Sequence, residues 1–174
     1  MAKTKTTTFR IDEDYDIELR KIAEENQISV NSLINQIIGN YVLIERPMKQ
    51  YGSITSSVDL FLEFISNLDT KTLEEIGTKI GTKEPKEFIQ FKWNEVTRGT
   101  VLEFLQIYCT HCGYGIPEIN TDNEKISIVI NHGLGEKFSN YFKSFLFAMF
   151  KTTLGKTSEF ILRKNMLVCT ITEI

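Results

Sequence analysis

Hydrogen-bonding side chains alternate with apolar ones near the start of the chain, in Thr6-Thr7-Thr8-Phe9-Arg10-Ile11. A period of two predicts a β-strand, because successive strand side chains point to opposite faces. One face then carries Thr6, Thr8 and Arg10, and the other carries Thr7, Phe9 and Ile11. Arginine can bind both acceptors on the edge of a guanine, and threonine can donate, accept or contact a thymine methyl group. The first face therefore has the chemistry needed to read DNA bases.

Two amphipathic helices are predicted directly after this strand. The first runs from about Glu13 to Glu25, with Asp12 as its N-cap and Tyr15, Leu19, Ile22 and Ala23 on its buried side. After a turn, Ser29 caps a second helix with the apolar positions Val30, Leu33, Ile34, Ile37, Ile38, Tyr41 and Val42. The second helix is too apolar for a small isolated unit.

A unit of about fifty residues with a lone strand cannot close a hydrophobic core. An unpaired strand leaves half of its backbone groups and its apolar face in water. A second copy of the chain must therefore supply the missing surface.

The segment from roughly Lys3 to Ile44 resembles the ribbon-helix-helix family of transcriptional repressors, the MetJ/Arc/CopG-like group. The resemblance implies an intertwined homodimer in which two protomers pair their strands antiparallel and interlock their helices. It also implies that Thr6, Thr8 and Arg10 read base edges in the major groove, which is wide enough for a two-stranded ribbon.

Phosphate contacts are expected from two places in this segment. Lys3 and Lys5 make the first residues locally basic, although the net charge of the whole chain is -3. Ser29, Val30 and Asn31 match the start of the family's second helix, where free backbone N–H groups would hold a DNA phosphate.

The turn between the two predicted helices departs from the family pattern. Many members have glycine before the hydrophobic residue of this turn, and this chain has Gln27 before Ile28. We expect Asn26 to take the left-handed conformation instead.

Composition predicts a second domain after a linker. Pro47, Gly52 and Ser53 are expected to break the second helix, so we assign 1–46 to the DNA-binding and dimerisation domain and 47–53 to a linker. The remaining residues, 54–174, hold eleven of the twelve phenylalanines and the only tryptophan. They can bury a core of their own, and we assign them to effector sensing or oligomerisation.

The periodicity of 54–174 predicts a separate α+β domain. Helices are expected near 55–68, 70–80, 85–93 and 97–112, followed by a β-β-α-β-β segment with strands at 116–119 and 125–130, a helix at 134–154 and a hairpin of 159–163 and 166–172. The aromatic stripe of the 134–154 helix is expected to cover the sheet, and its width leaves contact with a partner or a ligand as the alternative.

All cysteines and histidines lie in the second domain. Cys109-x-x-Cys112 has a spacing that can bind Zn²⁺ or another transition metal, with His111 or His132 completing the site. However, the two cysteines continue an apolar helical stripe, which is typical of buried structural cysteines. The sequence therefore favours no metal and no cofactor, and a metal-responsive regulator that uses this cluster remains an alternative.

No catalytic motif is present, so we do not expect an enzyme. Three cysteines and no long apolar run predict a cytoplasmic protein that does not bind membranes. The interpretation is a sequence-specific transcription regulator, a repressor by analogy with the family, whose partners are double-stranded DNA, a second copy and an unknown small-molecule or protein effector. Tetramers could form through the second domain. An antitoxin-type repressor that binds a protein partner is a further alternative.

Overall fold

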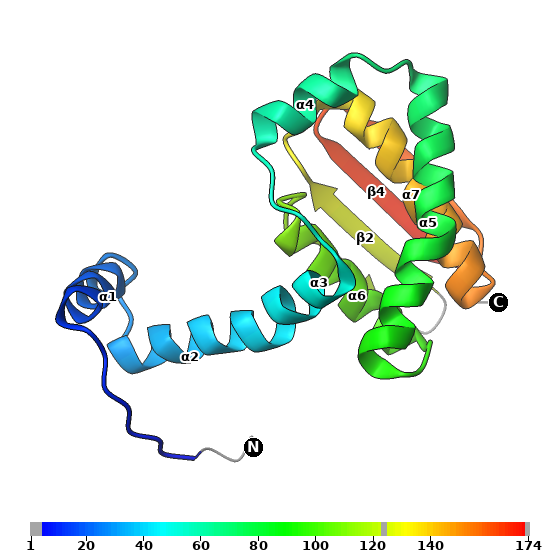
Figure 1. Cartoon of the computed structure of the whole chain (residues 1–174). Helices are drawn as coiled ribbons and strands as arrows, with labels where there is room; N and C mark the ends of the chain where they lie inside the picture. Colours follow the sequence, from blue (N-terminus) through cyan, green and yellow to red (C-terminus); the bar gives the residue numbers. More distant parts are fainter. Residues whose placement is uncertain (1–4, 123–124, 173–174) are drawn as a thin grey trace. The chain divides into compact units, whose positions relative to one another are not determined.

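The computed structural model describes residues 5–122 and 125–172 and has a mixed α+β fold (Figure 1). Internal contacts divide the chain into unit 1 (Met1–Pro47) and unit 2 (Met48–Ile174). Within the described ranges, no helix is both long enough and apolar enough to cross a membrane.

Unit 1 consists of an extended segment and a run of helices. Residues 5–12 have no regular secondary structure, and α1 (Glu13–Glu25), α2 (Val30–Asn40) and a π-helical turn, η1 (Tyr41–Glu45), follow. The expected strand at residues 6–11 is therefore not formed in the single chain. A strand needs a hydrogen-bonded neighbour, and the described part of unit 1 contains no other extended segment that could pair with it.

The turn after α1 corrects one expectation. Asn26 has φ -88° and ψ 0°, and Gln27 takes the left-handed conformation with φ 54°. The N–H of Ile28 donates to the carbonyl of Ala23, and that of Gln27 donates to Glu24, each at 3.0 Å. This pair of bonds is a Schellman motif, which places the left-handed residue one position after the cap.

The segment expected to be a linker is largely helical. The helix does not end at Pro47. Helix α3 (Arg46–Tyr51) follows directly after the π-helical turn and contains this proline. A π-helical turn changes the local hydrogen-bond pattern, which accommodates a residue that has no N–H to donate. Met48 is buried, and the ring of Tyr51 packs edge-on against Phe88, so these residues are part of the core of unit 2.

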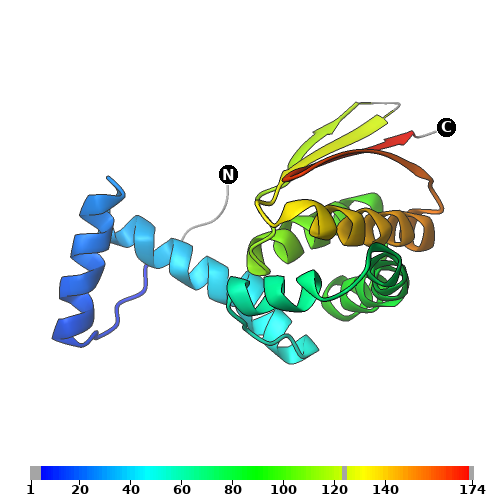
Figure 2. The same cartoon turned by 90° about the horizontal axis from the view of Figure 1, so that it is seen from above.

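Unit 2 has a helical half and a β-β-α-β-β half, as the sequence predicts. Its further elements are α4 (Val58–Ser66), α5 (Thr70–Trp93), α6 (Arg98–His111), β1 (Glu118–Thr121), β2 (Lys125–Asn131), α7 (Gly135–Leu154), β3 (Ser158–Arg163) and β4 (Met166–Thr172). The strands form one antiparallel sheet in the order β1-β2-β4-β3. Helices cover one face of this sheet (Figure 2).

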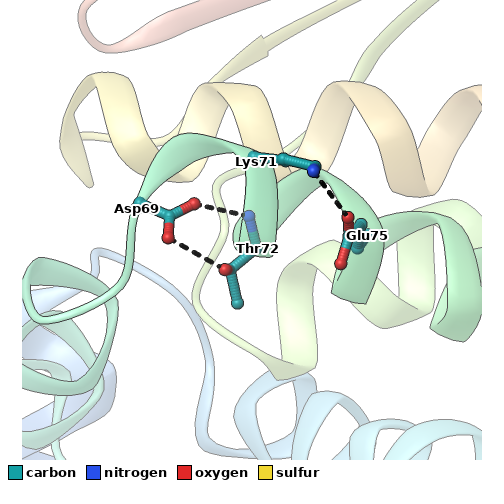
Figure 3. A network of polar contacts seen from close by, with 4 residues as sticks. All are labelled: Asp69, Lys71, Thr72 and Glu75. Carbon is teal, nitrogen blue, oxygen red and sulfur yellow. Dashed lines mark hydrogen bonds and ion pairs between the residues drawn. The ribbon is translucent and has the colours of Figure 1, made fainter.

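Helix α5 is continuous, whereas the sequence predicts two helices separated before Pro85. Asp69 is the N-cap of this helix. Its carboxylate accepts hydrogen bonds from the N–H and the hydroxyl of Thr72, at 2.8 and 3.1 Å (Figure 3). These bonds lower the pKa of Asp69. Pro85 stays inside the helix because it belongs to a buried stripe with Gly77, Gly81 and Ile89, and the packing of this stripe offsets the lost hydrogen bond.

Helix α7 is the centre of unit 2. Three residues of β2 and three of β4 turn a fully buried apolar face toward the helical layer, namely Ile126, Ile128, Ile130, Leu167, Cys169 and Ile171. Helix α5 is the other main neighbour of α7, which explains its wide aromatic stripe. Aromatic rings continue from α7 to α6, where Phe145 stacks on Tyr108 with ring centroids 5.2 Å apart.

The turn between β3 and β4 is tied to the start of α7. The carbonyl of Asn165 accepts from the N–H of His132 at 3.0 Å, and its side-chain oxygen accepts from the N–H of Gly135 at 3.1 Å. Ser139, in the first turns of α7, donates to the carbonyl of Arg163 at 3.1 Å. Polar bonds therefore hold together the corner where β2, α7 and the last hairpin meet.

Two glycines allow α5 to approach the backbone of α7. A Cβ atom at Gly77 would lie 2.3 Å from the carbonyl oxygen of Tyr141, and one at Gly81 would lie 2.2 Å from that of Phe145. Backbone atoms cannot move aside as a flexible side chain can. The contact between α5 and α7 therefore requires glycine at both positions.

We expect Gly81→Ala to lower the free energy of unfolding by about 2 kcal/mol, because the added methyl group forces the two helices apart. Gly99→Ala is the matched control, since the nearest atom to its added Cβ is the hydroxyl oxygen of Thr97 at 3.8 Å. Chemical denaturation monitored by circular dichroism measures both. Equal stability of the two variants would contradict the close helix contact.

Candidate nucleic-acid interface

The predicted base-reading residues lie on the extended segment before α1. Thr6, Thr8 and Arg10 are all exposed, as is Lys5, one of the predicted phosphate-binding residues. The other predicted lysine, Lys3, lies outside the described residues. This segment thus presents hydroxyl, guanidinium and ammonium groups to solvent.

The apolar side chains of the same segment contribute to a groove in unit 1. Phe9 and Ile11 line it from the extended segment, and its other lining residues are Leu19 of α1 and Ile34, Ile37 and Ile38 of α2. Its volume is about 310 Å³, and none of Thr6, Thr8 and Arg10 lines it. The groove is only partly closed, because Phe9 is 54% exposed and Ile38 is 51% exposed.

Unit 1 buries very little of its apolar surface. Among its described residues, only Ala23 and Leu33 are buried. The large apolar side chains left exposed are Phe9, Ile11, Tyr15, Ile17, Ile22, Ile37, Ile38, Tyr41, Val42 and Leu43. Exposed apolar side chains that form one contiguous patch are typical of an interaction site, and the groove gathers several of these residues.

The start of α2 is a helix N-terminus with Ser29 as its N-cap. The side chain of Ser29 accepts a hydrogen bond from the N–H of Ser32 at 3.1 Å, and the Ser29 carbonyl accepts from Leu33 at 3.0 Å. The N–H groups of Val30 and Asn31 precede these donors at the positive end of the helix. Such groups bind phosphate oxygens well.

Arg20, another exposed arginine of unit 1, is bonded to a carboxylate of its own helix. Its Nε atom donates to Asp16 at 2.7 Å within α1, and this hydrogen bond raises the pKa of Arg20. Arg20 is therefore engaged by a carboxylate on its own helix.

The two cysteines of Cys109-x-x-Cys112 differ in their burial. Cys109 is fully buried inside α6, and Cys112 is partly exposed at its C-cap. Burial raises the pKa of both thiols, to about 12 for Cys112. A raised pKa favours the neutral thiol in the metal-free chain.

His132 is engaged by other groups. Its Nδ1 accepts from the N–H of Leu134 at 3.0 Å, and its Nε2 lies 2.9 Å from the hydroxyl oxygen of Ser139. Burial lowers the pKa of His132, which favours this neutral, hydrogen-bonded ring. Across residues 5–122 and 125–172, no three His, Cys, Asp or Glu side chains are grouped to hold a metal ion, and His111 stays partly exposed at the end of α6.

Unit 2 contains a pocket that sequence reasoning missed. It has a volume of about 350 Å³ and is lined by the segment 53–57, by Phe61 and Phe64 of α4, by His111 at the end of α6, and by Cys112 and Tyr114 after this helix. These segments are far apart in the sequence and carry no shared motif. Only their packing brings them together.

We expect Cys109→Ser to lower the free energy of unfolding by about 1 to 3 kcal/mol, because the change buries a hydroxyl in an apolar site. Cys112→Ser should cost less, because Cys112 is partly exposed. The double variant should carry the same metal content as the parent protein by elemental analysis. Near-stoichiometric zinc that is lost in the double variant would contradict a structural role for the pair.

Comparison with known proteins gives no family assignment. No family model matches the sequence, and no curated protein is significantly similar to it.

Proposed function

We propose that this protein is a dimeric ribbon-helix-helix regulator of transcription. In this proposal, two copies of unit 1 pair their extended segments antiparallel and present Thr6, Thr8 and Arg10 to the major groove of double-stranded DNA. Unit 2 senses an effector or assembles dimers.

The groove in unit 1 is the observation that carries the proposal. Phe9 and Ile11 lie against Leu19, Ile34, Ile37 and Ile38, yet the surface remains largely open in a single chain. Pairing with a second copy would bury both grooves and supply the ladder that residues 6–11 lack. Apolar burial contributes about 25 cal/mol per Å² and would favour this association.

The polar groups of unit 1 support the DNA-binding part of the proposal. Along residues 8–11, Thr8 and Arg10 lie outside the groove and alternate with Phe9 and Ile11, which line it, so that pairing would leave Thr6, Thr8 and Arg10 on the outer face of the ribbon. The N-terminal N–H groups of α2 would hold a phosphate beside the groove. This division between base contacts and phosphate contacts is common in DNA-binding proteins.

The pocket of unit 2 supports a sensory role for this unit. Its volume lies in the range of small-molecule sites, and its lining contains aromatic rings together with serine and threonine residues of 53–57. None of the lining residues is an aspartate, glutamate, lysine or arginine. An effector that binds there would be an uncharged and largely apolar small molecule.

We expect Arg10→Ala to weaken specific DNA binding by about 1 to 3 kcal/mol and to leave the fold intact, because it removes one base-reading side chain per protomer. The target sequence is first selected from a random duplex library with the parent protein. Affinity is then measured at fixed salt by fluorescence anisotropy.

Arg20→Ala is the matched control, since it removes the same charge from an exposed residue that is paired on α1. Its affinity should stay close to that of the parent protein. Equal losses of affinity in the two variants would show that Arg10 acts only through its positive charge and does not read a base. A library that yields no enriched sequence would contradict the proposed function.

We expect Ile38→Glu to separate the unit 1 dimer and to abolish specific DNA binding, because it places a carboxylate in the apolar groove. Ile38 is 51% exposed in the single chain, so the fold of each chain should persist. Sedimentation velocity and circular dichroism measure the two properties.

Ile17→Glu provides the control for this variant. Ile17 is 57% exposed and does not line the groove, and it lies about 200° around α1 from Leu19. It should associate and bind DNA as the parent chain does. Dimerisation that resists Ile38→Glu would show that the groove is not the interface.

A further inference from the structure

Strand β3 (Ser158–Arg163) forms one edge of the sheet in unit 2. Among the residues that the structure describes, its hydrogen-bonded neighbour is β4, on one side only. Every second residue of such a strand turns its N–H and C=O groups toward the free edge. Glu159, Ile161 and Arg163 are exposed on one face of β3, and Ile161 is 62% exposed.

The sequence of β3 is complementary to itself about Ile161. When two copies pair antiparallel with Ile161 opposite its equivalent, Glu159 of each copy lies opposite Arg163 of the other. The pairing therefore contains two pairs of opposite charges. On the opposite face of the sheet, Phe160 then lies opposite Leu162. Opposite charges and apolar pairs at directly facing positions each stabilise an antiparallel ladder.

A neighbouring register loses this complementarity. With Phe160 opposite its equivalent, Glu159 would face Ile161 and Ser158 would face Leu162, so polar groups would oppose apolar ones. The other edge strand, β1 (Glu118–Thr121), has four residues against six in β3, and a short edge strand is one of the usual protections against pairing.

We propose that β3 is a self-association site, at which a second copy of this chain adds its own β3 antiparallel about Ile161. The two four-stranded sheets then form one continuous antiparallel sheet related by a two-fold axis. This site is separate from the proposed groove in unit 1 and does not depend on DNA binding. It gives unit 2 an assembly role.

Disulfide trapping in the full chain tests the register. Residues directly opposite each other in an antiparallel pair have Cα atoms about 4.5 to 5.5 Å apart, within the range of a disulfide. Ile161→Cys chains should therefore cross-link to one another under mild oxidation. Glu159→Cys chains should not, because their equivalent residues lie about 13 Å apart along the strands.

A mixture of two variants gives the most specific signal. Glu159→Cys and Arg163→Cys chains should form a mixed disulfide with each other, and neither should cross-link alone. Mass spectrometry of the linked peptides distinguishes these products from any that involve Cys112, which is partly exposed. The parent chain sets the background.

Charge reversal tests the complementarity. Adding Glu159→Arg to Ile161→Cys should slow cross-linking by about tenfold, since two attractive cross-strand pairs become repulsive. Further addition of Arg163→Glu should restore the rate, and circular dichroism checks that each chain folds. Equal cross-linking of the Ile161→Cys and Glu159→Cys chains, or a rate that the double reversal does not restore, would overturn the proposal.

Discussion

The constraint on which this protein depends is that unit 1 cannot bury its own apolar surface. A single extended segment and two short helices enclose only Ala23 and Leu33, while Phe9 and Ile38 stay half exposed. The free energy that would hold such a unit together must come from contacts outside it. Unit 2 has the opposite character, because the sheet and α5 together surround α7 and bury most of its aromatic side chains.

Much of the fold could be predicted because periodicity reports burial directly. The β-β-α-β-β half follows from alternating strands and a helix ended by Gly155, which is left-handed with φ 67°. The predicted elements are wrong where packing between distant segments, and not the local sequence, determines the backbone conformation. Pro85 remains inside α5 because its ring is buried, and Tyr51 keeps its segment ordered by packing on Phe88.

The candidate site was predictable only in part. Alternation along residues 6–11 separates Arg10 from Phe9, and Phe9 and Ile11 of the predicted inner face line the groove, whereas Thr7 does not. The left-handed residue was misplaced by one position, because the hydrogen bonds of the turn select Gln27 regardless of the side chain's own preference. The pocket of unit 2 could not be predicted, since Phe64 and Tyr114 come together only through folding.

The polar corner around Asn165 has a consequence for how the sheet finds its alignment. Ile126, Ile128 and Ile130 face Ile171, Cys169 and Leu167, so a slip of two residues between β2 and β4 would keep every apolar side chain on the same face. Apolar burial alone barely distinguishes these alignments. The hydrogen bonds that Asn165 accepts from the N–H groups of His132 and Gly135 form only in the native alignment. A few directional contacts thus convert a degenerate aliphatic surface into a single native pairing.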